Sequence, residues 1–188
     1  REKFGSVLTR KLVSFYTLRF IHKSVSHNLP TKNMTAKKED LPHLTKEEIR
    51  EGTKNGTKKY ENLSFFEEYS MFMGVAQILE FGLKKLLQEK FQYDLDKMEK
   101  WTLGRTTNEL EKNGLREDFI YLLKSLVEYR NYIAHELLFD DALTNSLLGN
   151  KTLKNHYSKS HRTLHKAILE LEQLVFLFDW TNANDGWD

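Results

Sequence analysis

The stretch that most constrains the fold is 117–139, with the sequence EDFIYLLKSLVEYRNYIAHELLF. It contains no glycine or proline that would break a helix. Apolar and aromatic side chains recur in it every three or four residues, which is the spacing of one face of an α-helix. These residues are Phe119, Leu122, Leu126, Tyr129, Ile133 and Leu137. The segment therefore predicts a buried helix around which the rest of the chain is organised.

Arg130 departs from this apolar pattern. At about 100° per residue it lies about 40° from Leu126, at the edge of the apolar stripe. A guanidinium there loses much of its hydration, so it needs an anionic partner or ligand. His135 lies about 140° further round the helix, nearly opposite the stripe. Two interpretations are open: an arginine that packs its stem at the core edge beside a solvated histidine, or a cation and an imidazole that flank an interface with a second copy.

Arg130, the polar Asn131, three further residues and His135 resemble the R-polar-x3–5-H motif of the HEPN superfamily. The resemblance extends over roughly residues 63–180, and residues 1–60 do not match it. It implies an all-α domain. Many members of this superfamily are metal-independent ribonucleases of toxin–antitoxin, abortive-infection and RNA-processing systems, so the resemblance implies such an activity.

The implied reaction is transesterification of RNA, in which a 2′-hydroxyl attacks the adjacent phosphorus and the 5′-oxygen leaves. His135 suits acid–base work, Arg130 suits the phosphate, and Asn131 orients either group or donates a hydrogen bond. No metal or other cofactor is implied. One histidine is not easily both acid and base, so we expect a homodimer with two Arg130 and two His135 in one cleft. Tyr132 either stacks on a base in that cleft or packs in the core.

The net charge of +2 means that RNA affinity has to come from a local patch. Lys159, Arg162 and Lys166 make the polar side of the last predicted helix basic, and we expect them to face RNA. His161 and His165 are four residues apart and could share a metal. Because no third ligand is evident, packing or solvation is the favoured interpretation.

The chain divides by composition into three parts. Residues 1–60 are a basic N-terminal extension, helical over 1–28 and then a polar loop, although residues 12–21 also have the composition of a strand. Residues 61–182 are the HEPN-like helical bundle, and 183–188 a frayed tail.

Helix boundaries follow from capping residues and apolar spacing. Thr45 and Glu48 form a capping box that opens a short helix, and Asn62 or Ser64 begins a long helix that ends near residue 91. Thr102 caps a short helix to about residue 112, and the last helix covers 151–180. An acid on the long helix, Glu67, Glu68 or Glu80, is a candidate partner for Arg130, although solvated acids are the favoured interpretation.

Bulk properties narrow the protein class. At 39% hydrophobic residues the chain is too apolar to be disordered, and no run of about 18 apolar residues predicts a membrane span. The absence of cysteine excludes disulfides and fits a reducing compartment, so a cytoplasmic location is expected. The predicted function is a toxin or anti-phage endoribonuclease with RNA and an antitoxin or regulatory protein as partners. The alternatives are a non-catalytic HEPN-like module that binds RNA, a nucleotide or a protein, and a plain helical interaction domain.

Overall fold

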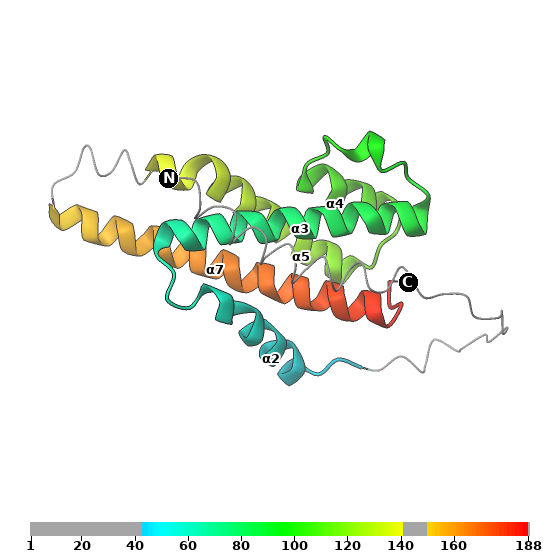
Figure 1. Ribbon diagram of the computed structural model, residues 1–188, viewed down its shortest axis with the longest axis horizontal. Helices are drawn as coiled ribbons and strands as arrows, with labels where there is room; N and C mark the ends of the chain where they lie inside the picture. The colour runs from blue at the N-terminus through cyan, green and yellow to red at the C-terminus, as the bar shows by residue number, and fades with distance from the viewer. Residues whose placement is uncertain (1–42, 141–149, 188) are drawn as a thin grey trace, which may run out of the picture. The chain divides into compact units, whose positions relative to one another are not determined.

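The computed structural model describes residues 43–140 and 150–187, and side chains in all of these except 150–158. Every regular element in these ranges is a helix, which confirms the all-α prediction (Figure 1). The elements are α2 (Lys46–Thr57), η2 (Lys58–Tyr60), α3 (Phe65–Phe91), η3 (Asp96–Met98), α4 (Leu103–Lys112), α5 (Glu117–Tyr132), η4 (Ile133–Leu137) and α7 (Asn150–Ala183). The helix predicted over 1–28 lies outside the described residues.

The predicted capping residues begin the helices. Ser64 donates its hydroxyl and its N–H to the Glu67 carboxylate, at 2.7 and 2.8 Å, and this capping box starts α3. Thr45 and Glu48 form the equivalent box at the start of α2. The Thr102 hydroxyl accepts from the N–H of Arg105 at 3.4 Å and starts α4. Each box or cap satisfies backbone N–H groups that the first turn leaves without a partner.

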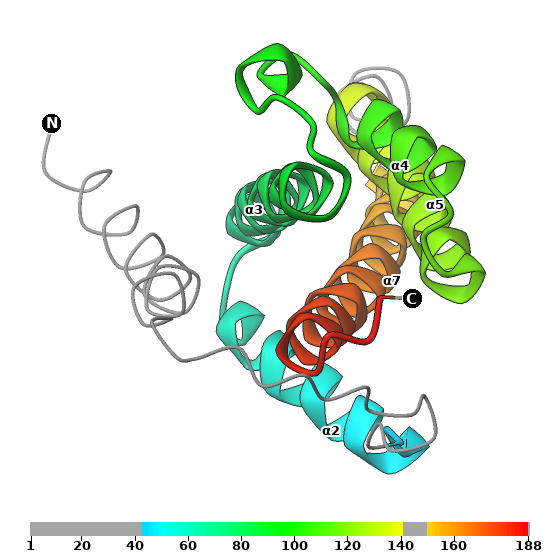
Figure 2. The same ribbon diagram turned by 90° about the vertical axis from the view of Figure 1, so that its right-hand side faces the viewer.

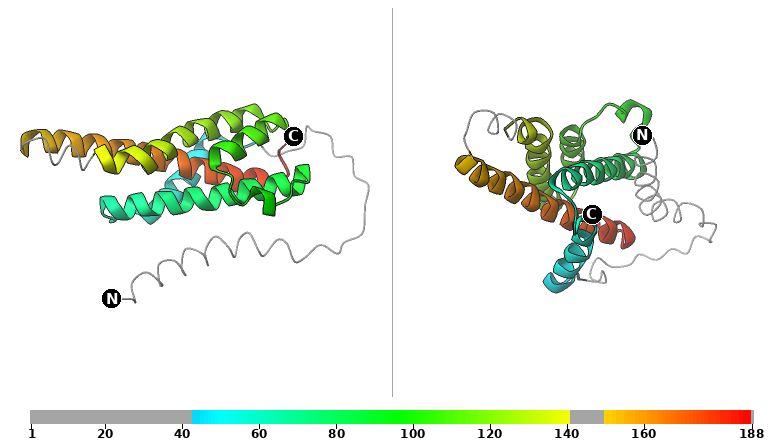
Figure 3. Two further views of the ribbon diagram at one scale, coloured as in Figure 1. Left: turned by 90° about the horizontal axis from the view of Figure 1, so that it is seen from above. Right: turned by 60° about the vertical axis from the view of Figure 1, so that its left-hand side comes forward.

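Helix α7 is the central element of the bundle, and α2, α3 and α5 all pack against it. Figure 2 shows α7 between α3 on one side and the α4–α5 pair on the other, with α2 crossing it. Figure 3 shows α3, α5 and α7 running alongside one another. The wholly buried side chains between them include Phe72, Leu83, Leu123, Leu126, Leu164 and Leu171. None of the helices in the described ranges is long and apolar enough to cross a membrane.

Helix α2 has 12 residues and is longer than the one or two turns that the sequence predicts. A Cβ added to Gly52 would overlap the ring of Phe176, and one on Gly56 would lie 2.5 Å from the Glu172 carboxylate. The sequence analysis places these glycines in a polar loop. In the structure they lie on α2, and their lack of a side chain lets α2 approach α7 closely. The compact unit that contains α2 runs Leu41–Asp188.

The prediction of a frayed tail is wrong as far as Trp187. Its side chain is only 2% exposed and packs edge-on against Phe119, with 5.1 Å between ring centroids. The guanidinium of Arg116 donates to the carbonyl of Gly186 at 3.1 Å. The buried indole, whose burial removes a large apolar area from water, and this hydrogen bond together hold the end of the segment against the bundle.

Candidate functional site

The predicted motif lies where α5 changes its helical geometry. Residues Ile133–Leu137 form a π-helix, with i→i+5 closure, and the chain is α-helical again over 138–140. His135 is in the middle of this π turn, and Arg130 precedes the turn by three residues. A wider turn rotates less per residue than an α-helix, so it offsets the 40° drift between residues four apart. Ile133 and Leu137 are accordingly both 0% exposed.

Arg130 is half-buried on the core side of α5. It lies between Leu126 and Ile133, both of which are completely buried. No hydrogen bond or ion pair joins its guanidinium to any residue that the structure describes. The predicted acidic partners are engaged elsewhere or do not pair with it: Glu67 caps α3 and Glu80 accepts from Lys84 at 2.9 Å.

The partial exposure of Arg130 follows from where α4 begins. A Cβ on Gly104 would lie 3.3 Å from Val127, so the first turn of α4 packs against this part of α5. Since α4 and α5 form an antiparallel pair and α4 starts at Leu103, α5 continues past α4 from about Arg130 onward. Figure 1 shows this overhanging end of α5. Helix α4 therefore does not cover this side of Arg130, which the structure leaves half-buried.

Asn131 and His135 are both exposed, and within the described part of the chain neither side chain has a hydrogen-bond partner. In one chain, then, Arg130 and His135 are not joined to each other. The motif presents one half-buried cation, one exposed amide and one exposed imidazole at the same end of α5. Such a set can bind an anion and exchange a proton with it.

Tyr132 and Asp140 bracket the π turn. The Tyr132 hydroxyl donates to the Asp140 carboxylate at 3.4 Å, and burial, followed by the charges of Asp140 and Glu136, raises the pKa of Tyr132. The phenol is thus held neutral and half-buried beside the motif. The sequence does not reveal this contact, because the two residues are eight apart and do not share the spacing of one helix face.

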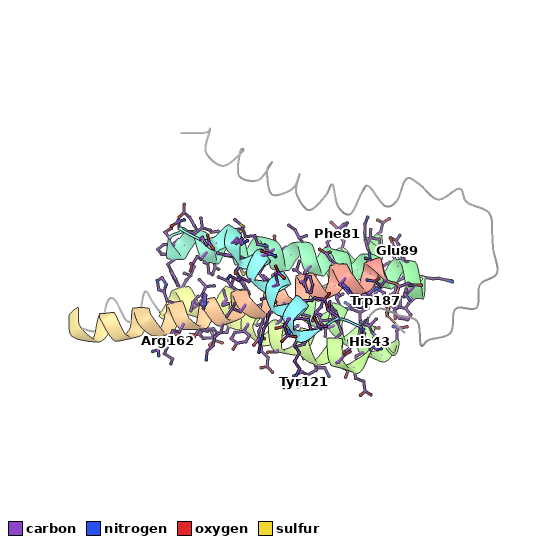
Figure 4. All side chains as sticks on the ribbon, turned by 90° about the horizontal axis from the view of Figure 1, so that it is seen from below. His43, Phe81, Glu89, Tyr121, Arg162 and Trp187 are labelled. Atoms are coloured by element: carbon purple, nitrogen blue, oxygen red, sulfur yellow. The ribbon has the colours of Figure 1, made fainter. Side chains whose placement is uncertain are left out.

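The predicted basic residues of α7 lie at the level of the motif. The Ser125 hydroxyl donates to the Glu170 carboxylate at 2.7 Å, and this bond fixes the register between α5 and α7. Because the two helices are antiparallel, residues at about 159–166 of α7 lie alongside about 129–136 of α5. Lys159, Arg162 and Lys166 are all exposed there, and Figure 4 shows Arg162 on the outer edge of α7.

A shallow groove of about 350 Å³ runs between α7 and α3 at this level. It is lined by Glu68, His161, Arg162, His165 and Lys166. The ring of His161 packs against Phe65, with 4.6 Å between centroids, and His165 is exposed. Among the described residues no three His, Asp or Glu side chains are placed to hold a metal together.

A second polar cluster, away from the motif, joins α2 and η2 to α7. The buried carboxylate of Glu172 accepts from the ammonium of Lys59 at 2.6 Å and from the hydroxyl of Tyr60 at 3.0 Å. Burial raises the pKa of Glu172, although Lys59 and Tyr60 act in the opposite direction. Each oxygen of this carboxylate has a partner in its own chain, which favours a structural role for Glu172.

No family model, curated protein or solved structure matches the chain. The HEPN resemblance therefore rests on the motif of Arg130, Asn131 and His135 and on the helical fold around it.

Proposed function

We propose that the protein is a metal-independent endoribonuclease of the HEPN type. The observation that supports this best is the half-buried Arg130, without a partner in the described part of the chain, followed by an exposed His135 on a π turn. A guanidinium that has lost hydration gains most from an anion that accepts two hydrogen bonds, and a phosphodiester is such an anion. Single π turns inside α-helices are frequent at functional sites.

In this proposal Arg130 binds the scissile phosphate and stabilises the charge that develops on its oxygens. One His135 accepts the proton of the 2′-hydroxyl as that oxygen attacks phosphorus. A second imidazole donates a proton to the departing 5′-oxygen. The products are a 2′,3′-cyclic phosphate and a 5′-hydroxyl, and Asn131 orients the phosphate or one imidazole.

The second imidazole is the reason to propose a homodimer. It comes from His135 of a second copy related by a two-fold axis, so that the overhanging ends of both α5 helices meet. Phe139, which follows the π turn, is 63% exposed and so is available to contact a second copy. The resemblance adds a cytoplasmic toxin or anti-phage role, held in check by an antitoxin or regulatory protein.

The decisive experiment measures RNA cleavage in the presence of EDTA. We expect cleavage by the wild type, and a loss of about 10²–10⁴-fold in His135→Ala and Arg130→Ala, because each removes a group that acts on the reacting atoms. His43→Ala and Arg50→Ala are matched controls, since both residues are exposed and outside the motif. Circular dichroism checks that all variants fold.

Equal cleavage by the wild type and both motif variants would remove the catalytic proposal. RNA binding without cleavage would instead favour the non-catalytic module. The dimer has its own test, because a composite site requires activity per chain to rise with protein concentration in step with dimer formation in sedimentation. Full activity of a strict monomer would contradict it.

A further inference from the structure

We infer that the outer face of α7 beside the motif is a track for the backbone of single-stranded RNA, with the groove of Arg162 and Lys166 as its main phosphate-binding site. The choice of RNA rests on the proposed function. The existence of the track does not depend on cleavage and can be tested by binding alone.

The first argument is the spacing of the cations. Lys159, Arg162 and Lys166 are three and four residues apart, so they share one side of α7 and span about 10 Å along it. All three are exposed. A single row of cations along one helix follows one phosphate backbone, and a single strand presents its backbone in that form.

The second argument is the charge balance at two members of this row, Lys159 and Lys166. Many other cations of the described chain have carboxylate partners: Lys59 with Glu172, Lys84 with Glu80, Lys112 with Glu109, Lys124 with Glu111 and Arg116 with Asp118. No ion pair engages Lys159 or Lys166 in the ranges that the structure describes. The net charge of +2 is too small to attract RNA by itself, so a local excess of this kind has to supply the attraction.

The third argument is the position of the row. The Ser125–Glu170 bond places this part of α7 alongside the π turn of α5. A strand whose scissile phosphate lies at Arg130 therefore has its neighbouring phosphates within reach of α7. Glu68 forms the opposite wall of the groove on α3 and repels phosphate, which directs the backbone to the α7 side.

The test uses a fluorescently labelled 2′-O-methyl RNA, which keeps the RNA backbone but has no free hydroxyl to attack phosphorus. Anisotropy titrations at several salt concentrations give its affinity for the full chain. For the double variant Arg162→Gln/Lys166→Gln we expect affinity to fall about tenfold or more. The slope of log K against log salt should fall by about 1.4, at about 0.7 for each single-strand phosphate contact.

The matched control is Lys54→Gln/Lys58→Gln, at the end of α2 and the start of η2. It removes the same charge at the same spacing, from an exposed face that also carries Glu47 and Glu51. We expect it to change affinity less than twofold. Lys166→Gln alone, with about half the loss in slope, keeps the test valid if the double variant does not fold.

Glu68→Gln supplies a change of opposite sign. Removing its repulsion should strengthen binding by about twofold or more, whereas general damage to the groove would weaken it. The inference is overturned if the α7 and α2 double variants lose affinity equally, or if the α7 variants bind like the wild type. If the α7 variants bind like the wild type, RNA cleavage can still occur, and only the binding track is contradicted. If the wild type binds RNA through α7 but does not cleave it, only the proposed nuclease activity is contradicted.

Discussion

Glu172 and Arg130 are both charged side chains set among apolar residues, but only Glu172 has hydrogen-bonding partners among the described residues. Glu172 is 2% exposed and is held by Lys59 at 2.6 Å and Tyr60 at 3.0 Å. Arg130 is half-buried between two completely buried residues, and the described chain supplies nothing to its guanidinium. A charge removed from water needs compensation, and in the first case the fold provides it. In the second case no described residue provides it, and in our proposal an RNA phosphate does.

This difference is the basis on which we propose a structural role for Glu172 and a functional role for Arg130. Glu172 lies at a closed contact, where Gly52 and Gly56 bring α2 close to α7. Arg130 lies at an open one, where α5 extends beyond α4. We therefore expect substitutions at the two positions to affect different properties: stability at Glu172 and RNA chemistry at Arg130.

The largest effect should come from Arg130→Leu. Loss of the phosphate ligand should lower the cleavage rate by about 10²–10³-fold. The free energy of unfolding should stay the same or rise by up to about 1 kcal/mol, because leucine continues the apolar stripe and removes an uncompensated charge. Cleavage assays and urea denaturation measure the two quantities. A clear decrease in the free energy of unfolding would mean that Arg130 stabilises the fold, and would contradict the proposed difference between Arg130 and Glu172.

Lys59→Met should show the opposite pattern. It leaves the Glu172 carboxylate buried without its cation, which should lower the free energy of unfolding by about 3 kcal/mol, while cleavage by the folded fraction stays unchanged. The double variant Lys59→Met/Glu172→Leu should recover most of this loss, because it removes the charge together with its partner. If the single variant were as stable as the wild type, Glu172 would not depend on Lys59.

The sequence predicts the helices well because their signals are local. The Thr45 capping box and the Thr102 cap are confirmed, and of the two predicted caps Ser64 is the one that starts α3. The apolar spacing that predicts α5 and α7 depends only on neighbouring residues. The contacts of α2 and of Trp187 are not local, and the sequence-based interpretation missed both. Without α7 beside them, Gly52 and Gly56 resemble loop residues. Without its contact to Phe119, Trp187 resembles a residue of a solvent-exposed tail.

The site shows the same division. Arg130, Asn131 and His135 are found by their spacing, and Arg162 and Lys166 by their charge. The π turn is not predictable, because residues four apart, such as Ile133 and Leu137, fit an α-helix equally well. The bond between Tyr132 and Asp140 depends on that turn and is missed with it.

A smaller effect is the dependence of stability on pH. The pKa of Glu172 is raised in the folded protein, so above its ordinary value of 4.5 the folded state holds a proton more strongly than the unfolded chain. The contribution of this proton binding to the free energy of unfolding is fully present below pH 4.5 and is lost as the pH rises through the pKa of Glu172 in the folded protein. The wild type should therefore lose stability relative to Glu172→Gln over this range.

The comparison with Glu172→Gln is needed because other carboxyls act in the opposite direction. The pKa of Asp118 is lowered by Arg116, so its contribution disappears on acidification in both proteins and cancels in the difference. Denaturant melts between about pH 4 and pH 8 measure this difference. A difference that stays constant with pH would mean that Glu172 keeps its ordinary affinity for protons, and that Lys59 and Tyr60 offset its burial completely.

The smallest effect tests whether a hydrogen bond within the chain stabilises the π turn that follows α5. Tyr132→Phe removes the hydroxyl that bonds to Asp140 across the π turn, and should lower the free energy of unfolding by about 0.5–1.5 kcal/mol. Amide hydrogen exchange should become faster at Ile133–Leu137 and stay unchanged in α3, because the bond brackets only this turn. Phe81→Leu, on an exposed face of α3, is the control. Unchanged exchange in the turn would mean that the burial of Ile133 and Leu137 alone maintains the wider helix, and that His135 is positioned by the core instead of by this hydrogen bond.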